Sequence, residues 1–372
     1  MGPARVQTMD LGALRRHHMS LVLELLLREG PASRASLSAK TGLAKASVSS
    51  VVSDLLELDL VRELDARASG RPGRPATDVA VNTSSVAGLG LEINVDSVAA
   101  SIVDLAGQER ATFRRNADNR VRPSGKVFTD LRAVAKQALR VAADEHVRVP
   151  GATLALPGLV DPATGHVFVA PNLHWLDVSG DVRTALRLPG RLGVRCDNEA
   201  NLAALAELRF GVGFSLTSFV YVSAGADVGV GSGVVVDGRL RSGAHGFAGE
   251  VGHITVDPNG PACGCGARGC LETLVRADAP EDALVVAVAT ALRSVVHVLD
   301  PEAVVLGGHL GARGAAFAAA VEERLAAVTL GGRWRRCRIL TATFGADAAL
   351  VGGATAAVTD VLANPMLLAA TG

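Results

Sequence analysis

The sequence predicts an α/β protein with a small, mostly helical domain at its N-terminus. Two patterns predict this fold class: apolar residues recur at helical spacing before residue 60, and strand-like and helix-like segments alternate from about residue 86 onward. The chain has 372 residues, enough for two or three domains of about 100–200 residues each. Hydrophobic residues make up 49% and charged residues 20%, a balance that excludes a disordered chain.

Three helices are predicted in the first 60 residues. Residues 11–29 carry apolar side chains mostly at helical spacing, and Gly30 ends this helix. Ser33 is placed to cap a second helix, because its hydroxyl can accept a backbone amide. A glycine-containing turn at 41–43 precedes the third helix, at about 45–58, as a helix-turn-helix requires. The apolar stripe of that third helix consists of Val48, Val51, Val52, Leu55 and Leu56.

The opposite face of the third helix carries short polar side chains, which let a helix approach DNA and reach phosphates and base edges. The predicted DNA contacts on this face are Lys45, Ser47, Ser49 and Ser50. After a strand-like stretch at 60–64, residues 66–77 hold three arginines and no acid. A wing that inserts Arg71 and Arg74 into a minor groove fits this composition, because a narrow groove concentrates negative potential. We therefore predict a winged helix-turn-helix domain over 1–80 that binds operator DNA; the alternative is a small helical domain followed by a solvated linker.

The charge balance limits how this domain binds DNA. Lys+Arg and Asp+Glu each number 37, which excludes a chain coated in basic charge. Residues 1–80 hold 11 basic and 9 acidic side chains, so their basic excess is only two. We expect operator binding to depend on direct contacts and on symmetry, because two half-sites require a homodimer or a dimer of dimers.

The α/β part covers residues 81–372. Strand-like segments lie at 86–91, 98–103, 153–156, 219–223, 233–236 and 303–306, and helix-like segments at 126–145, 200–210 and 282–299. Such alternation indicates an α/β architecture.

Neither a signal peptide nor a membrane helix is expected. The N-terminus lacks an apolar core followed by a small-residue cleavage site. No uncharged apolar run reaches the roughly 18 residues that a membrane helix needs. We therefore expect a cytoplasmic protein with no membrane partner, in a reducing compartment that favours metal-bound cysteines over disulfides.

Three of the five cysteines predict a metal site. Cys263, Cys265 and Cys270 fall within eight residues and are separated mainly by glycines, so their thiols can converge on one ion. His253, ten residues upstream, is the best candidate for a fourth ligand. Four protein ligands would make a closed, structural zinc site. The alternative is a set of thiols that binds no metal.

Five motifs between about residue 86 and the C-terminus resemble the ROK family, named for repressors, open reading frames and kinases. The motifs are Pro157–Gly165, Asn172–Trp175, Asn198–Leu205, Phe247–His253 and the cysteine run that ends at Cys270–Glu272. Their order is that of the family. The resemblance implies a two-lobed, actin/hexokinase-like ROK domain over 81–372 with a sugar cleft between its lobes. It also implies zinc ligands at His253, Cys263, Cys265 and Cys270, in a zinc loop over 253–272.

The resemblance places sugar contacts on amides and acids, which suit a ligand rich in hydroxyls. The implied contacts are Asn172, Asn198, Glu250, His253 and Glu272, and Glu199 joins them as the acid at the position of the kinases' general base. These residues do not identify which sugar or sugar phosphate binds. The alternative is that they are relics in a cleft that no longer binds sugar.

Departures from the family's kinases fall on phosphate binding and catalysis. The kinases' Asp-x-Gly-Gly-Thr loop becomes residues 92–96, with Asn94 and Val95 in place of two glycines and Asp96 in place of the threonine. Glu199 replaces the aspartate that is the kinases' general base. Its longer side chain displaces the carboxylate, and a misplacement near 1 Å costs about a hundredfold in rate. The glycine-rich loop at 223–233 carries an acid, Asp227. We therefore predict a sugar-responsive regulator, a repressor of carbohydrate genes without kinase activity. The alternatives are an active sugar kinase and a purely architectural DNA-binding protein.

Overall fold

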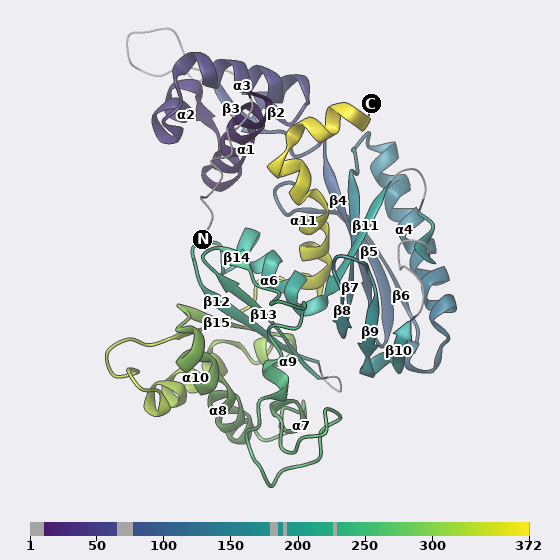
Figure 1. Ribbon diagram of the computed structural model, residues 1–372, viewed down its shortest axis with the longest axis vertical. Helices are drawn as coiled ribbons and strands as arrows, with labels where there is room; N and C mark the ends of the chain where they lie inside the picture. The colour runs from purple at the N-terminus through teal and green to yellow at the C-terminus, as the bar shows by residue number, and fades with distance from the viewer. Residues whose placement is uncertain (1–10, 65–76, 179–184, 189–191, 226–228, 372) are drawn as a thin grey trace, which may run out of the picture.

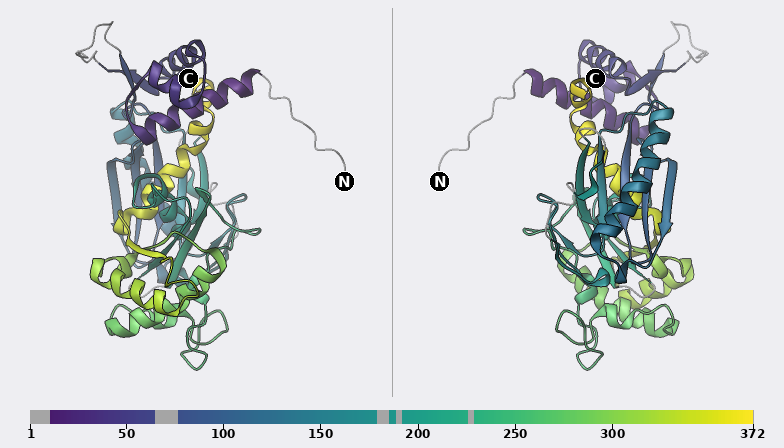
Figure 2. Two further views of the ribbon diagram at one scale, coloured as in Figure 1. Left: turned by 90° about the vertical axis from the view of Figure 1, so that its left-hand side faces the viewer. Right: turned by 90° about the vertical axis from the view of Figure 1, so that its right-hand side faces the viewer.

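The computed structural model describes residues 11–64, 77–178, 185–188, 192–225 and 229–371. The chain forms an N-terminal domain and two lobes, named here lobe 1 and lobe 2 (Figure 1). The C-terminal helix extends from the lobes to the N-terminal domain, and the two views of Figure 2 agree on this arrangement. The α/β fold class predicted from the sequence is confirmed.

The N-terminal domain joins three helices to a small antiparallel sheet of strand order β1-β3-β2. The Ser33 hydroxyl accepts a hydrogen bond from the Ser36 amide, as predicted for a helix cap. Gly42 ends the second helix with φ of 73°, a left-handed conformation that favours glycine. The elements are α1 (Leu11–Glu29), β1 (Ala32–Ser33), α2 (Arg34–Thr41), α3 (Lys45–Glu57), β2 (Val61–Glu63) and β3 (Asp78–Val81).

Helix α3 is amphipathic in the way the sequence predicts. Its buried stripe is made of Val48, Val51, Val52 and Leu55. On the opposite face Lys45, Ser49 and Ser50 are exposed, whereas Ser47 is half-buried. Strands β2 and β3 pair antiparallel and so form the two sides of a hairpin. Most of the predicted wing, including Arg71 and Arg74, lies outside the described residues.

Lobe 1 is a five-stranded sheet of order β11-β7-β4-β5-β6 with helices on both faces. Helix α4 packs on one face and α11 (Ala348–Ala363) on the other, and α6 (Glu199–Phe210) lies between α11 and strands β12 and β13 of lobe 2 (Figure 1). A small sheet of order β10-β9-β8 adjoins it. The other elements of lobe 1 are β4 (Ala87–Ile93), β5 (Ser97–Asp104), β6 (Glu109–Asn116), η1 (Asn119–Val121), α4 (Ser124–Asp144), β7 (Gly151–Leu156), β8 (Leu159–Val160), β9 (Val167–Ala170), η2 (Pro171–Leu173), β10 (Trp175–Val178) and β11 (Gly193–Asn198).

Lobe 2 is a second five-stranded sheet, of order β14-β13-β12-β15-β16, against which two long helices bury their apolar faces. These helices are α8 and α10, and they pack on each other. The elements are β12 (Phe219–Ala224), β13 (Val230–Val236), β14 (Arg239–Leu240), η3 (Val251–His253), α7 (Leu271–Leu274), α8 (Glu281–Leu299), β15 (Ala303–Gly307), α9 (Gly308–Gly311), α10 (Gly314–Val328), β16 (Arg338–Thr341) and η4 (Gly345–Asp347).

Helix α11 lies unusually close to its neighbours, because glycines remove the side chains that would separate the backbones. A Cβ added to Gly90 of β4 would lie 2.0 Å from the Leu350 carbonyl oxygen. A Cβ added to Gly352 would lie 1.7 Å from the carbonyl oxygen of Leu202 in α6. The helix is therefore held against β4 and α6 by direct backbone contact.

The end of α11 and the following η5 (Pro365–Thr371) complete the core of the N-terminal domain. Val358, Val361 and Leu368 belong to the same buried cluster as Met19 and Leu23 of α1. The N-terminal domain thus shares a core with the C-terminal helix.

Two helices of the described residues are long and apolar enough to cross a membrane by length and composition alone. They are α8 and the segment Gly345–Ala363, which includes α11. Both have packing partners in this structure, since α8 contributes to the core of lobe 2 and α11 to a buried cluster with β5 and α6. Helices in a protein core are often as long and as apolar, so burial in this fold explains the composition of both helices.

Candidate functional site

Four side chains that the sequence singles out as metal ligands come together in lobe 2. His253 ends η3, Cys263 and Cys265 lie in the loop that follows, and Cys270 immediately precedes α7. Their ligand atoms all lie within 4.8 Å of one another. Cys265 Sγ is 3.7 Å from Cys270 Sγ, and Cys263 Sγ is 3.6 Å from His253 Nδ1. The structure therefore contains a cluster that could hold a metal ion.

These spacings fit tetrahedral coordination. With metal–sulfur distances of about 2.3 Å and metal–nitrogen distances of about 2.0–2.1 Å, tetrahedral angles separate two sulfurs by about 3.8 Å and a sulfur from a nitrogen by about 3.6 Å. The Ala267 backbone amide hydrogen-bonds to Cys265, which lowers the pKa of that thiol to about 7. The lowered pKa favours the thiolate of Cys265, which is the form that binds metals, whereas burial raises the pKa of the Cys263 and Cys270 thiols.

A glycine closes the loop that carries the cysteines. Gly269 has φ of 60°, and a Cβ there would lie 1.6 Å from the Asp257 carbonyl oxygen. The Val256 amide donates to the Gly269 carbonyl at 2.8 Å. Only glycine fits this approach, which holds Cys270 next to the strand-like segment after His253.

Two of the expected sugar ligands flank His253 itself. His253 Nε2 is 3.8 Å from a carboxylate oxygen of Glu250, and Nδ1 is 3.4 Å from Oε1 of Glu272. The Cys263 thiol donates a hydrogen bond to the same Glu272 oxygen at 2.8 Å. Burial raises the pKa of Glu250, and the neighbouring His253 partly opposes this. The metal cluster and the acidic residues therefore form one continuous polar region.

Asn172 of η2 reaches this region from lobe 1. A Cβ added to Gly229 would lie 3.4 Å from Glu272 Oε2 and 3.5 Å from Asn172 Nδ2. The carboxylate and the amide thus face the same glycine from the two lobes. The structure brings together four of the six expected sugar ligands at this junction: Asn172, Glu250, His253 and Glu272.

The remaining two expected sugar ligands, Asn198 and Glu199, lie at the N-terminal end of helix α6. Asn198 Oδ1 accepts a hydrogen bond from the Ala200 amide at 2.8 Å, and Asn198 Nδ2 donates to the Gly158 carbonyl at 2.9 Å. Asn198 therefore caps α6 and fixes the turn after β7. Burial, reinforced by the neighbouring Glu92, raises the pKa of Glu199 to about 7.

The environment of Glu92, at the end of β4, was not predicted from the sequence. Its side chain is 4% exposed, and burial raises the pKa of its carboxyl to about 7 although Arg114 Nη1 lies 3.3 Å away. Arg114 also pairs with Asp347 at 2.9 Å. One signal could have found Glu92: it is the single charged residue in the otherwise apolar strand Ala87–Ile93.

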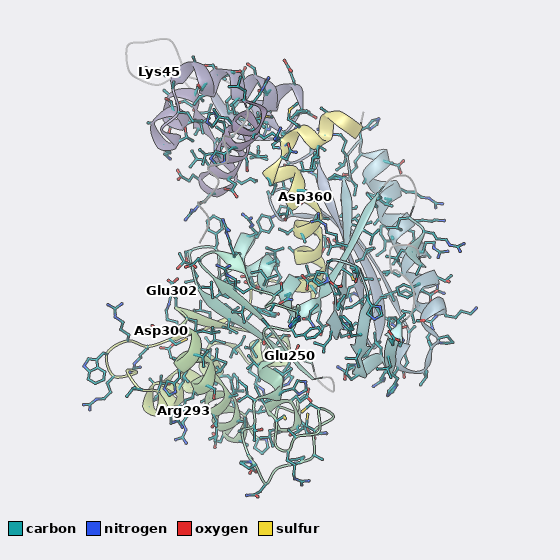
Figure 3. All side chains as sticks on the ribbon, viewed as in Figure 1. Lys45, Glu250, Arg293, Asp300, Glu302 and Asp360 are labelled. Carbon is teal, nitrogen blue, oxygen red and sulfur yellow. The ribbon has the colours of Figure 1, made fainter. Side chains whose placement is uncertain are left out.

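The face of α3 expected to bind DNA lies apart from this polar region. Lys45 is in the N-terminal domain, whereas Glu250 is in lobe 2 (Figure 3). A ligand near Glu250 would therefore act on DNA contacts only through the intervening structure.

Comparison with known proteins identifies the family. The ROK family pattern matches residues 88–284, just over half of the chain. The chain belongs to the ROK family. The family resemblance drawn from the sequence motifs is thereby confirmed.

Several ROK relatives are repressors. The chain is 31% identical over 264 residues to the xylose repressor of Bacillus subtilis (strain 168), a match that covers 71% of this chain and 66% of the repressor. It is 29% identical over 279 residues to the N-acetylglucosamine repressor of Escherichia coli O157:H7, covering 73% of this chain and 65% of that protein. The matched regions thus span slightly less than two thirds of each repressor.

Solved structures of ROK proteins share the fold. A ROK family transcriptional regulator, described as a homolog of the E. coli MLC protein, superposes with a TM-score of 0.75 at 24% identity, covering 96% of this chain and 98% of its own. The ROK hexokinase of Thermus thermophilus gives a TM-score of 0.61 at 28% identity and covers 74% of this chain and 99% of its own. The two-lobed ROK architecture expected from the motifs is confirmed.

Proposed function

We propose that this protein is a sugar-responsive, DNA-binding transcriptional regulator that represses genes of carbohydrate uptake or catabolism. One observation carries the proposal: the chain combines a helix-turn-helix with an exposed polar recognition face and ROK lobes whose phosphate-binding region is acidic. The names of the related repressors support the same assignment, and xylose and N-acetylglucosamine are the first sugars to test.

On the DNA side, α3 enters the major groove with Lys45, Ser47, Ser49 and Ser50 toward the operator. The arginines Arg71 and Arg74 insert into the minor groove, because a narrow groove concentrates negative potential that attracts their positive charge. A homodimer, or a dimer of dimers, presents two such helices to two half-sites. We place the protein in the cytoplasm, in contact with operator DNA and with no membrane partner.

On the effector side, a sugar or sugar phosphate binds where the lobes meet. Glu250 and Glu272 accept hydrogen bonds from sugar hydroxyls, and Asn172 orients the ring. Asn198 and Glu199 contribute from the start of α6, where Asn198 chiefly holds the surrounding backbone. His253 connects the sugar to the cysteine cluster, so that a ligand can favour one arrangement of the lobes over another.

The cysteine cluster holds a structural zinc ion, with His253, Cys263, Cys265 and Cys270 as ligands. Three thiolates and one imidazole are a donor set typical of structural zinc. The ion fixes the loop over 253–272 and, through it, the positions of His253 and Glu272.

Phosphoryl transfer is absent in this proposal because both phosphate loops carry added acids: Asp96 stands where the kinases have a threonine, and Asp227 lies in the glycine-rich loop at 223–233. Glu92 contributes to the raised pKa of Glu199, and Asp96, three residues beyond the strand that carries Glu92, contributes to the raised pKa of Glu92. At about 4 Å and an effective dielectric near 20, each contact between a carboxylate and a phosphate charge costs about 4 kcal/mol.

Selection of DNA by the purified protein tests the regulator directly. We expect the full chain to enrich a duplex with two symmetric half-sites from a random pool, and an Arg71→Ala/Arg74→Ala variant to bind it more weakly with a flatter salt dependence. Failure to enrich any duplex would contradict the proposal. Sugar-dependent ATP turnover in a coupled assay, abolished in Glu199→Gln, would instead favour a sugar kinase, the activity named for the Thermus relative.

A further inference from the structure

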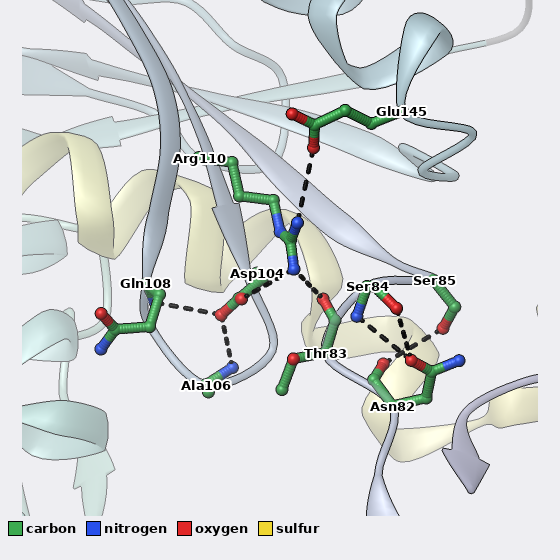
Figure 4. A network of polar contacts seen from close by, with 9 residues as sticks. All are labelled: Asn82, Thr83, Ser84, Ser85, Asp104, Ala106, Gln108, Arg110 and Glu145. Carbon is green, nitrogen blue, oxygen red and sulfur yellow. Dashed lines mark hydrogen bonds and ion pairs between the residues drawn. The ribbon is translucent and has the colours of Figure 1, made fainter.

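The linker between the N-terminal domain and lobe 1, residues 82–86, is held by two arginines of lobe 1. Arg110 of β6 donates a hydrogen bond from Nη2 to the Thr83 carbonyl at 3.1 Å (Figure 4). The same guanidinium pairs with Asp104 at 3.3 Å and with Glu145 at 3.4 Å. The linker is thus attached to β5, β6 and the end of α4 at once.

The groups around Arg110 are themselves fixed. Asp104 is 6% exposed, and its Oδ1 accepts hydrogen bonds from the Ala106 and Gln108 amides at 2.9 and 3.0 Å. At the other end, Asn82 accepts hydrogen bonds from the amide and the hydroxyl of Ser84, at 3.2 and 2.7 Å (Figure 4). This network leaves the linker little freedom to rotate.

Arg148 connects the linker to the recognition helix. Its backbone amide donates to the Ser85 carbonyl at 2.9 Å, and its carbonyl accepts from the Ala87 amide at 3.0 Å. Its guanidinium donates to the carbonyl of Leu58, the residue that caps the C-terminal end of α3. The last carbonyls of a helix lack partners within it and carry negative partial charge, so a cation stabilises this end.

Other contacts reinforce the docking of the N-terminal domain. The cluster shared by α1, α3 and α11 includes Val86 and Leu105, from the linker and from the turn after β5. Arg209 of α6 also lies 3.8 Å from Glu24 of α1. The N-terminal domain is therefore docked on the rest of the chain by a shared apolar cluster and an ion pair of α1, and α3 itself is contacted by Arg148 at its C-terminal end.

We propose that Arg148, supported by Arg110, is a positioning residue for operator binding. It fixes α3 relative to lobe 1, so that the two recognition helices of a dimer meet two half-sites already in the correct orientation. Binding of the second half-site then resembles an intramolecular step, and the ordering entropy of a free domain is avoided. This role rests on the proposed function and adds to it the residue that sets the geometry of DNA reading.

DNA titrations separate positioning from direct contact. Fluorescence anisotropy would compare Arg148→Ala with the wild type on the selected duplex and on a duplex with one half-site. We expect about a five- to tenfold loss of affinity for two half-sites, no change for one, and partial recovery in Arg148→Lys. Arg140→Ala, on the exposed face of α4, controls for the lost charge. Equal losses on both duplexes, tighter binding, or no effect would each overturn the proposal.

Hydrogen exchange tests the positioning without any DNA or sugar. In Arg148→Ala we expect faster exchange at the C-terminal end of α3 and in the linker, with unchanged protection in β4, β5 and β7. Unchanged exchange at α3 and the linker would overturn the proposal even if the protein binds DNA. Because this measurement needs no ligand, its outcome is separate from that of the proposed function.

Discussion

Cys263 Sγ lies 2.8 Å from Oε1 of Glu272, so a metal-site cysteine and an expected sugar ligand are in direct contact. Glu272 also lies 3.4 Å from His253, and both lobes approach Gly229 beside it. Any change in the order of the cysteine loop must therefore reach the residues at the lobe junction. Metal content and sugar affinity should be linked in this protein.

Loss of the metal should loosen this junction. We expect about one zinc ion per chain in the purified protein and none in Cys265→Ser. Since the ion stabilises the folded loop, its loss should cost about 2 kcal/mol, which for a domain of this size lowers Tm by roughly 4–8 °C. Elemental analysis and thermal unfolding measure both quantities.

The matched control is Cys337→Ser, because Cys337 is half-buried and lies outside the cluster. It should keep the metal. If the wild-type protein is purified without metal and takes up no zinc, the cluster is not a zinc site.

Glu272→Gln should weaken sugar binding. The amide keeps the shape of the side chain but removes the charge that strengthens hydrogen bonds from sugar hydroxyls, so we expect about a tenfold to hundredfold loss of affinity. Calorimetry with the sugar that binds the wild type measures the loss. Glu323→Gln, on the exposed side of α10, should bind like the wild type. Equal affinity in all three proteins would show that the sugar binds elsewhere.

Two acids with raised pKa values, the buried Glu92 and the half-buried Glu199, predict a stability that depends on pH. The pKa values of Glu92 and Glu199 are raised to about 7 from a usual value of 4.5, so the folded state binds these protons more tightly than the unfolded state. The stability that these two acids contribute to the folded state is fully present below pH 4.5 and is lost as the pH rises through about 7. Between pH 5 and 8 the free energy of unfolding should fall by on the order of 2 kcal/mol for each of the two groups.

Thermal unfolding of Glu199→Gln across the same pH range isolates this contribution. The glutamine imitates the protonated acid, so the variant should show a flatter decline and a higher Tm than the wild type at pH 8. Parallel curves for the two proteins would mean that Glu199 does not titrate near neutral pH.

Because glycines let α11 lie against its neighbours, adding one methyl group at such a contact should reduce the free energy of unfolding. Gly352→Ala forces α11 away from the Leu202 carbonyl and should reduce the free energy of unfolding by about 2–3 kcal/mol. Gly125→Ala, in α4, meets no atom within 4 Å and should instead add about 0.5–1 kcal/mol, because alanine favours helix. Denaturant titration compares them; a neutral Gly352→Ala would contradict the packing of α11.

Local patterns in the sequence were sufficient for much of the fold. The helices at 11–29 and 45–58, the Ser33 cap and the turn at Gly42 depend on neighbouring residues, and each is found where it was expected. The four metal-site residues were also identifiable, because their spacing and chemical type are distinctive.

Long-range contacts could not be predicted in the same way. Glu92 and Glu199 are 107 residues apart in the chain, so the contribution of Glu92 to the raised pKa of Glu199 depends on the tertiary fold. The contribution of Val358 and Leu368 to the N-terminal core likewise depends on where α11 ends. Both residues sit in apolar segments that would fit any core.

The central claim is that a sugar bound between the lobes changes how α3 binds DNA. Fluorescence anisotropy should measure the Kd of the full chain for its selected duplex without sugar and with xylose, N-acetylglucosamine and their phosphates. We predict that one of these sugars changes the Kd at least about fivefold, a coupling of about 1 kcal/mol, and that Glu272→Gln loses the response while binding DNA normally. If a sugar binds the wild type tightly, as measured by calorimetry, and leaves the Kd for DNA unchanged, the account is contradicted.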